Sequence, residues 1–111
     1  MDIYKLIALI DTALTEADIH VAKHYKGNEK PMESTRKALR ILKEEVEHSP
    51  ENINERVLRA MHDIGALSVK QFELYPLESA IGNVTKMLYD MIPSYKNLEP
   101  LRMDFGKGNP I

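Results

Sequence analysis

Two neighbouring side chains, His62 and Asp63, form the clearest candidate for chemistry in the sequence. An imidazole next to a carboxylate can hold a divalent metal ion, and a metal ion held in this way can generate hydroxide at neutral pH. The chain contains no cysteine, so it offers neither a thiolate ligand nor a thiol nucleophile. Its serines show no spacing that predicts a catalytic triad. Metal-dependent hydrolysis is therefore the enzymatic chemistry that the sequence suggests.

The string His62-Asp63-Ile64-Gly65 resembles the motif of the HD metal-dependent phosphohydrolases, in which an adjacent histidine and aspartate on a helix bind a metal ion. In that family an earlier histidine and a later aspartate complete the site. Residues of these types are present as His20, His24, Asp90 and Asp104. The chain departs from the family because Ala66 replaces the usual lysine, the interval from Asp63 to Asp90 is short, and 111 residues are few for that fold. We expect no metal site and no cofactor, and we keep the hydrolase, with His62 and Asp63 as ligands, as the alternative.

Glutamates gather where the second helix is expected to end. Seven basic residues between positions 23 and 43 are followed by a stretch that contains acids and no lysine or arginine. Carboxylates at the C-terminal end of a helix oppose the helix dipole, at a cost of about 0.3 kcal/mol or more each. Two explanations stay open: pairing within the helix at i,i+4 (Arg40 with Glu44, Lys43 with Glu47), or an acidic surface that attracts a basic partner.

A second acidic group is expected at the junction between the third and fourth helices. Tyr75 lies there between two carboxylates, and it could serve either as a contact for a partner or as a lid on the core. The two groups together supply the predicted partner-binding residues, which are Glu44, Glu45, Glu47, Glu51, Glu73, Tyr75 and Glu78.

Four helices are expected to carry these residues. Apolar residues recur at three- and four-residue steps over residues 2–26, 32–48, 53–72 and 76–92. Stop and start signals agree with these ranges: Gly27-Asn28 after the first helix, Ser49-Pro50-Glu51 before the third, and Pro93 after the fourth. Ser94 is expected to cap a last turn that contains Tyr95, Leu98 and Leu101.

The third helix has the most regular apolar pattern. Val57, Met61 and Ile64 define its buried face, so His62 is expected to point to solvent. Gly65 inside this pattern costs about 1 kcal/mol relative to alanine, which predicts close approach by a neighbouring helix. On the first helix, His24 lies at the margin of the apolar face and is expected to be partly buried.

No segment alternates with period two, and the connections between the helices are short. The sequence therefore predicts an all-α fold, namely an antiparallel up-and-down bundle of four helices with a short C-terminal helical turn. The single bundle domain is expected over residues 1–101, and an irregular tail over 102–111.

The composition restricts the class of protein further. A net charge of -2 argues against a dedicated nucleic-acid-binding protein, although Arg36, Lys37, Arg40 and Lys43 leave a basic RNA-binding face as a further alternative. The first residues carry an acid at position 2 and only a short apolar run, which predicts neither a signal peptide nor a membrane span. A chain without cysteine suits a reducing compartment. We therefore expect a cytoplasmic protein without a membrane partner.

In size, helical plan, lack of cysteine and acidic cluster, the chain resembles the all-helical immunity proteins that accompany bacterial contact-dependent and related polymorphic toxins. The resemblance assigns no individual residue. It implies a binding protein, not an enzyme, that neutralises a basic, nuclease-type toxin by covering its active surface. The acids would then pair with lysines of the toxin or take the place of RNA phosphates.

Overall fold

The computed structural model describes residues 2–28, 30, 32–71 and 76–99, with side chains described for all of these except 66–71. The described residues form four α-helices and one short 3-10 helix, and none of them is in a strand. In chain order the elements are α1 (Ile3–His24), α2 (Glu33–His48), α3 (Glu55–Gln71), α4 (Pro76–Met91) and η1 (Pro93–Asn97). The all-α fold with four helices and a C-terminal helical turn is confirmed.

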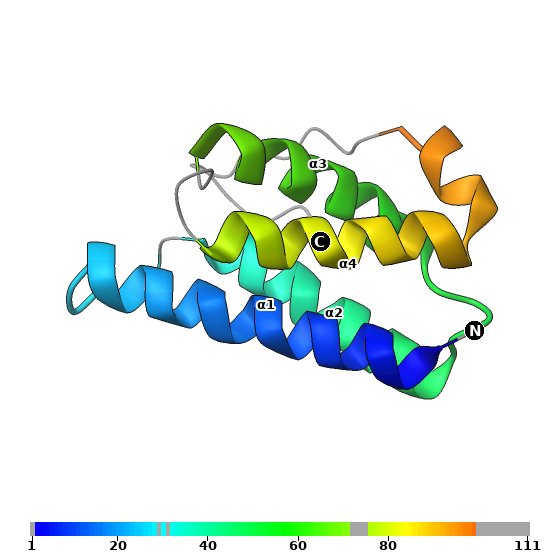
Figure 1. Ribbon diagram of the computed structural model, residues 1–111, viewed down its shortest axis with the longest axis horizontal. Helices are drawn as coiled ribbons and strands as arrows, with labels where there is room; N and C mark the ends of the chain where they lie inside the picture. The colour runs from blue at the N-terminus through cyan, green and yellow to red at the C-terminus, as the bar shows by residue number, and fades with distance from the viewer. Residues whose placement is uncertain (1, 29, 31, 72–75, 100–111) are drawn as a thin grey trace.

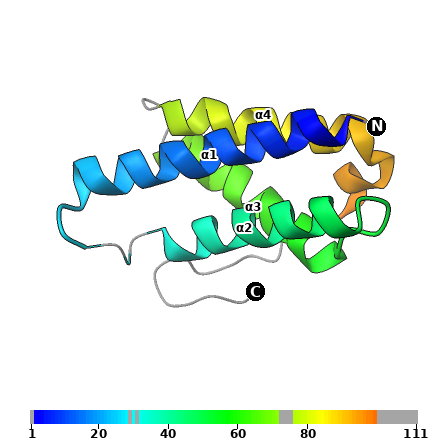
Figure 2. The same ribbon diagram turned by 90° about the horizontal axis from the view of Figure 1, so that it is seen from below.

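The helices surround one core. The chain reverses its direction from each helix to the next, as the colour gradient shows in Figure 1. α1 packs against α2 and α4, and α3 packs against the same two helices (Figures 1 and 2). η1 follows α4 and packs back against it, which places this short element at one end of the bundle.

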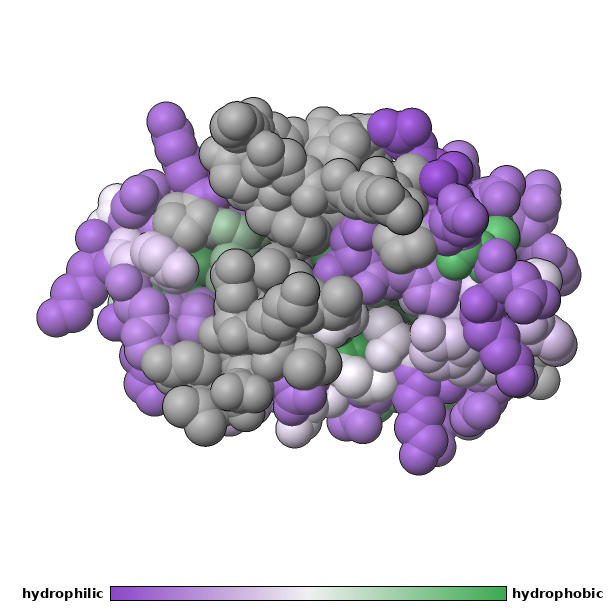
Figure 3. Space-filling view, turned by 90° about the horizontal axis from the view of Figure 1, so that it is seen from above, coloured by the Kyte–Doolittle hydropathy of each residue, from purple (hydrophilic) through white to green (hydrophobic). Residues whose placement is uncertain are grey.

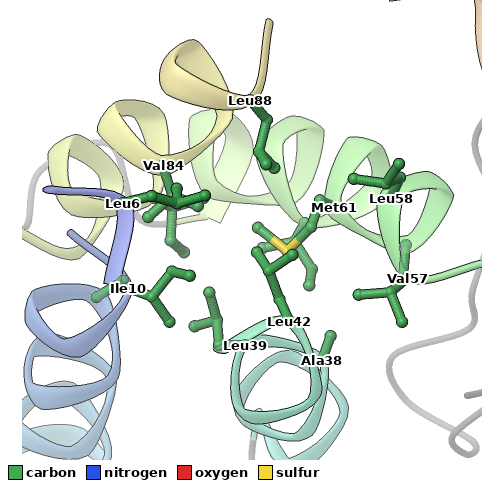
Figure 4. Close-up of a cluster of buried hydrophobic side chains, with 14 of the residues drawn as sticks. Leu6, Ile10, Ala38, Leu39, Leu42, Val57, Leu58, Met61, Val84 and Leu88 are labelled. Carbon is green, nitrogen blue, oxygen red and sulfur yellow. The ribbon is translucent and has the colours of Figure 1, made fainter. Parts of the chain in front are cut away.

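The core is a continuous cluster of aliphatic side chains to which all four helices contribute. Figure 4 shows these side chains pointing inward from their helices toward one another. Burying each large one contributes about 1.5–3 kcal/mol before the entropy cost of ordering it. The apolar periodicity correctly predicted these fully buried residues: Leu6, Ile10, Leu39, Leu42, Met61, Ile64, Ile81, Val84 and Leu88.

The third helix begins later than predicted. Ser49, which was expected to start it, instead ends α2, because its backbone N–H donates to the Glu45 carbonyl at 2.7 Å. α3 starts at Glu55, and the Oδ1 atom of Asn54 accepts from the Arg56 backbone N–H at 2.8 Å. Serine and asparagine are both good N-cap residues, and here the asparagine directly before the helix takes that position.

The remaining boundaries lie close to the predicted ones. α1 ends at His24, and Gly27 adopts a φ of +76°, a left-handed conformation that suits a glycine after a helix. Pro93 ends α4 as predicted and also begins η1, whose N-cap is Ile92 without a side-chain hydrogen bond. The cap predicted at Ser94 is therefore wrong. Phe72, Leu101 and the predicted tail over 102–111 lie outside the described residues.

Candidate protein-binding surface

Four of the acidic residues around the end of α2 are exposed. Glu44 and Glu47 project from α2, and Glu51 lies in the connection that leads to α3. Glu55, the first residue of α3, is exposed as well. We refer to these four residues as the acidic cluster. Glu44, Glu47 and Glu51 were among the predicted partner-binding residues, whereas Glu55 was not. The predicted Glu45 is partly buried and is not part of the cluster.

Glu45 holds the α2–α3 connection in place. Its Oε1 atom accepts a hydrogen bond from the Asn54 backbone N–H at 3.0 Å. Its Oε2 atom is buried and has no hydrogen-bond partner among the described residues. This contact keeps the start of α3 next to the end of α2, so that the acidic cluster occupies one end of the bundle. The hydrogen bond to Asn54 also explains why Glu45 lies near the C-terminal end of α2, where the helix dipole disfavours a carboxylate.

A groove of about 440 Å³ opens next to Glu51 and Glu55. It runs between the α2–α3 connection, the first turn of α3 and the α4–η1 junction, and we refer to it as the end groove. Its apolar lining comes mainly from Ile53, Leu58, Met91, Ile92 and Leu98. At the end of the molecule that holds η1, Figure 3 shows a small hydrophobic area bordered by hydrophilic side chains. Sequence reasoning missed this groove because its walls come from segments about forty residues apart.

The second predicted group is only partly described. Glu73 and Tyr75 lie outside the described residues. Glu78 lies in the first turn of α4, where the helix dipole favours a carboxylate, and is partly buried. It lines a hollow of about 200 Å³ between α3 and α4, which we refer to as the α3–α4 hollow. The same hollow is lined by Met61, His62, Gly65, Gly82, Thr85, Tyr89 and Tyr95.

The prediction that His62 points to solvent is wrong. Its ring is partly buried and stacks on the ring of Tyr95, with centroids 4.1 Å apart and an angle of 10° between the planes. Its Nε2 atom lies 2.7 Å from the Tyr95 carbonyl oxygen, which can only accept, so Nε2 carries the proton and donates. The physical reason is η1, which covers a face of α3 that a bundle of four helices alone would leave to water.

Three observations bear on the metal-site alternative. The Nε2 atom of His62 is taken up by a carbonyl and is not available to a metal ion. No three histidine, aspartate or glutamate side chains of the described residues lie close enough together to hold one. His20 and His24, with ring centroids 4.7 Å apart, belong to α1, which packs against α2 and α4. The candidate ligand Asp104 lies outside the described residues.

The prediction that His24 is partly buried is wrong. His24 is exposed, whereas His20 is buried, and both line a small hollow together with Pro76 and Leu77 at the start of α4. Burial lowers the pKa of His20, and the nearby His24 lowers it further. His20 therefore favours its neutral form in the folded protein.

Two basic residues of α2 form ion pairs with carboxylates of α1. Arg36 is buried and its guanidinium lies 3.1 Å from Asp18 Oδ1. Lys43 lies 2.7 Å from Asp11 Oδ1, and this hydrogen bond raises the pKa of Lys43. Glu47, the expected i,i+4 partner of Lys43, contributes to that rise only through its charge. Two of the four residues considered for RNA binding, Arg36 and Lys43, are thus paired with carboxylates of α1.

Comparison of the chain with protein-family models, with curated proteins and with solved structures finds no match. Function is therefore inferred from the residues and their geometry. Within the described part of the chain, the helices are too short or too polar to cross a membrane.

Proposed function

We propose that this protein is a helical binding module that engages a cationic, amphipathic segment of a partner protein at the end groove. The observation that carries this proposal is the combination of an apolar lining with two exposed carboxylates, Glu51 and Glu55, on one hollowed surface. Glu44 and Glu47 extend the negative charge along the end of α2. The described chain thus offers both parts of a protein contact, a hydrophobic centre and a charged rim.

The two parts have different physical tasks. Apolar side chains of the partner that cover the partly exposed Ile53, Ile92 and Leu98 contribute about 25 cal/mol for each Å² removed from water, which is the main source of affinity. The carboxylates attract lysines and arginines over several ångströms, which raises the association rate and rejects acidic competitors. A partner of this kind is both basic and amphipathic, a description that fits a surface helix or strand of a basic enzyme.

The biological role that we propose is neutralisation of such an enzyme, most simply a basic nuclease-type toxin, in the manner of an immunity protein. A small helical domain with one acidic end suits this role because it can cover a cationic active surface without changing its own fold. A large upstream gene that encodes a basic C-terminal domain would support this role. Co-purification of the two products, followed by loss of the toxin's activity, would test it directly.

The site itself can be tested with a synthetic amphipathic helix that carries leucines on one face and lysines on the other. Amide chemical shifts are expected to change around Ile53 and Leu98, with an affinity that falls as the salt concentration rises. Changing Glu51 and Glu55 to lysine is expected to weaken binding by about tenfold, the equivalent of about 1.4 kcal/mol. Glu33→Lys is the matched control, because Glu33 is also exposed in the first turn of a helix, at the start of α2.

Two outcomes would contradict the proposed site. One is an equal loss of affinity in the Glu33→Lys control, which would indicate a general charge effect. The other is binding of a peptide with glutamates in place of the lysines at the same affinity, which would remove the role of the acidic cluster.

A further inference from the structure

The α3–α4 hollow shares no lining residue with the end groove. Its volume of about 200 Å³ compares with about 30 Å³ for a water molecule in the liquid and about 300–1,000 Å³ for a typical small-molecule pocket. It therefore suits one slender organic group better than a nucleotide or a large cofactor. η1 lies over one end of the α3–α4 pair, as Figure 1 shows, and contributes Tyr95 to the wall.

Two glycines inside helices keep this hollow open. Gly65 of α3 and Gly82 of α4 both line it, and glycine is less favourable than alanine in a helix interior. Packing does not require either glycine: a Cβ atom on Gly65 would meet Thr85 Cγ2 at an ordinary 3.6 Å, and one on Gly82 would meet nothing within 4 Å. Close approach of the helices therefore does not explain Gly65, contrary to the expectation from the sequence. Space that is kept at a cost in helix propensity is a sign of a binding site.

Among the described residues that line the hollow, Glu78 is the acidic side chain, and Thr85, Tyr89 and Tyr95 carry hydroxyl groups. Glu78 contributes a carboxylate at the start of α4. His62 donates through Nε2 to the Tyr95 carbonyl, and its Nδ1 atom lies 3.5 Å from the Tyr89 hydroxyl. No lysine or arginine is among the described residues that line the hollow. A ligand that supplies donors and positive charge matches this set, and an anion does not.

The aromatic rings point to the same class of ligand. The centroids of Tyr89 and Tyr95 lie 4.8 Å apart, and the Tyr89 and His62 rings meet edge to face at 5.9 Å. Tyr89 remains 39% exposed, so part of its ring is available to a ligand. Organic cations bind over aromatic faces, where the ring quadrupole attracts positive charge. Tyr95 lines the hollow, and its hydroxyl is buried without a hydrogen-bond partner among the described residues.

We propose that the α3–α4 hollow binds an organic cation, namely a primary ammonium or guanidinium group on an aliphatic stem. The charged group pairs with Glu78, and the stem lies over Gly65 and Gly82 beside the ring of Tyr89. Such a cation can be a free small molecule or a lysine or arginine side chain of another protein. This inference does not rest on the proposed function of the end groove.

The test is an NMR titration of the purified chain with agmatine and n-butylammonium, and with n-butanol as the neutral counterpart. We expect saturable shifts at His62, Gly82 and Tyr89 with both cations and none with the alcohol. Glu78→Gln is expected to weaken binding by about tenfold, because it removes a charge-assisted hydrogen bond. Glu33→Gln is the matched control, since Glu33 lies in the first turn of α2 as Glu78 lies in the first turn of α4. The Glu33→Gln variant should bind both cations with the affinity of the unaltered protein.

Two further experiments complete the test. One distinguishes a free cation from a protein side chain, and the other uses a variant whose folding can be checked. Tighter binding of a blocked lysine peptide than of agmatine assigns the site to a protein side chain, and the reverse assigns it to a free cation. Gly82→Leu, at an exposed position, should fill the hollow and abolish binding while the helical circular dichroism is kept. Equal binding of n-butanol, an unchanged affinity in Glu78→Gln, or shifts confined to other surfaces would overturn the proposal. Variants at Glu51 and Glu55 should leave cation binding unchanged, so failure of one proposal does not imply failure of the other.

Discussion

The contact between α1 and α2 and the contact between α3 and α4 use polar residues in opposite ways. Across the first, two ion pairs join residues of the two helices: Arg36 with Asp18 at 3.1 Å, and Lys43 with Asp11 at 2.7 Å. The charges of α2 that face α1 are in this way matched within the chain. A surface whose charges are already paired has little left with which to attract a ligand.

The α3–α4 contact leaves its polar groups facing a hollow. Glu78 places a carboxylate on the wall of the hollow, and Gly65 and Gly82, which line it as well, add no side chain to it. Both contacts are supported by the same apolar core. The comparison teaches that net charge says little about this protein's surface, because the fold pairs some charges across α1 and α2 and places the Glu78 carboxylate at a hollow.

The largest change in the free energy of unfolding is expected at Tyr95 of η1, which stacks on His62 of α3. Tyr95 is fully buried, so Tyr95→Ala should lower the free energy of unfolding by about 3–5 kcal/mol through lost burial and the resulting cavity. Burial raises the pKa of the Tyr95 hydroxyl, with a contribution from Tyr89, so the group stays neutral. The control is Tyr95→Phe, which keeps the ring and removes only a hydroxyl without a described partner. Urea denaturation should show Tyr95→Phe within about 1 kcal/mol of the unaltered protein. A loss as large as that of the alanine variant would show that the hydroxyl is well bonded.

A smaller change in the free energy of unfolding, of opposite sign, is expected at Gly82 of α4. Gly82→Ala should raise the free energy of unfolding by about 1 kcal/mol, because alanine favours the helix and its Cβ meets no other atom within 4 Å. The measurement is the midpoint of urea denaturation at an unchanged m-value. A destabilised variant would mean that the space beside Gly82 is needed for folding, and the interpretation of the hollow as a binding site would lose its main support.

The smallest change in the free energy of unfolding is expected for the ion pair between α1 and α2. Asp18→Asn removes the charge that faces Arg36, but the Asp18 side chain is 64% exposed, so solvent screens the pair. We expect a loss of about 0.5 kcal/mol that shrinks further in 1 M salt. Thermal denaturation at two salt concentrations measures it. A loss of several kcal/mol that salt leaves unchanged would place this ion pair among the buried ones and would weaken the contrast between the two sides.

The sequence predicted well which residues of a helix are buried and which are exposed. The inward positions of α1, α2 and α4, the burial of Met61 and Ile64, and the surface positions of Glu44 and Glu47 all follow from the helical period. The period has this power because each helix has to bury one face and expose the other. The start of α3 was misplaced because two polar residues, Ser49 and Asn54, compete for the same capping task.

Residues whose roles depend on contacts between distant segments were not predicted. His62 and Tyr95 are 33 positions apart, Arg36 and Asp18 are 18 apart, and the end groove joins residues of α3 to residues of η1. A helical pattern gives the direction of a side chain relative to its own helix and says nothing of which other element lies there. The sequence by itself determined that this chain forms four amphipathic helices around an aliphatic core. Only the tertiary structure decided which polar groups are matched and which face open space, because η1 and the α2–α3 connection pack where no local rule places them.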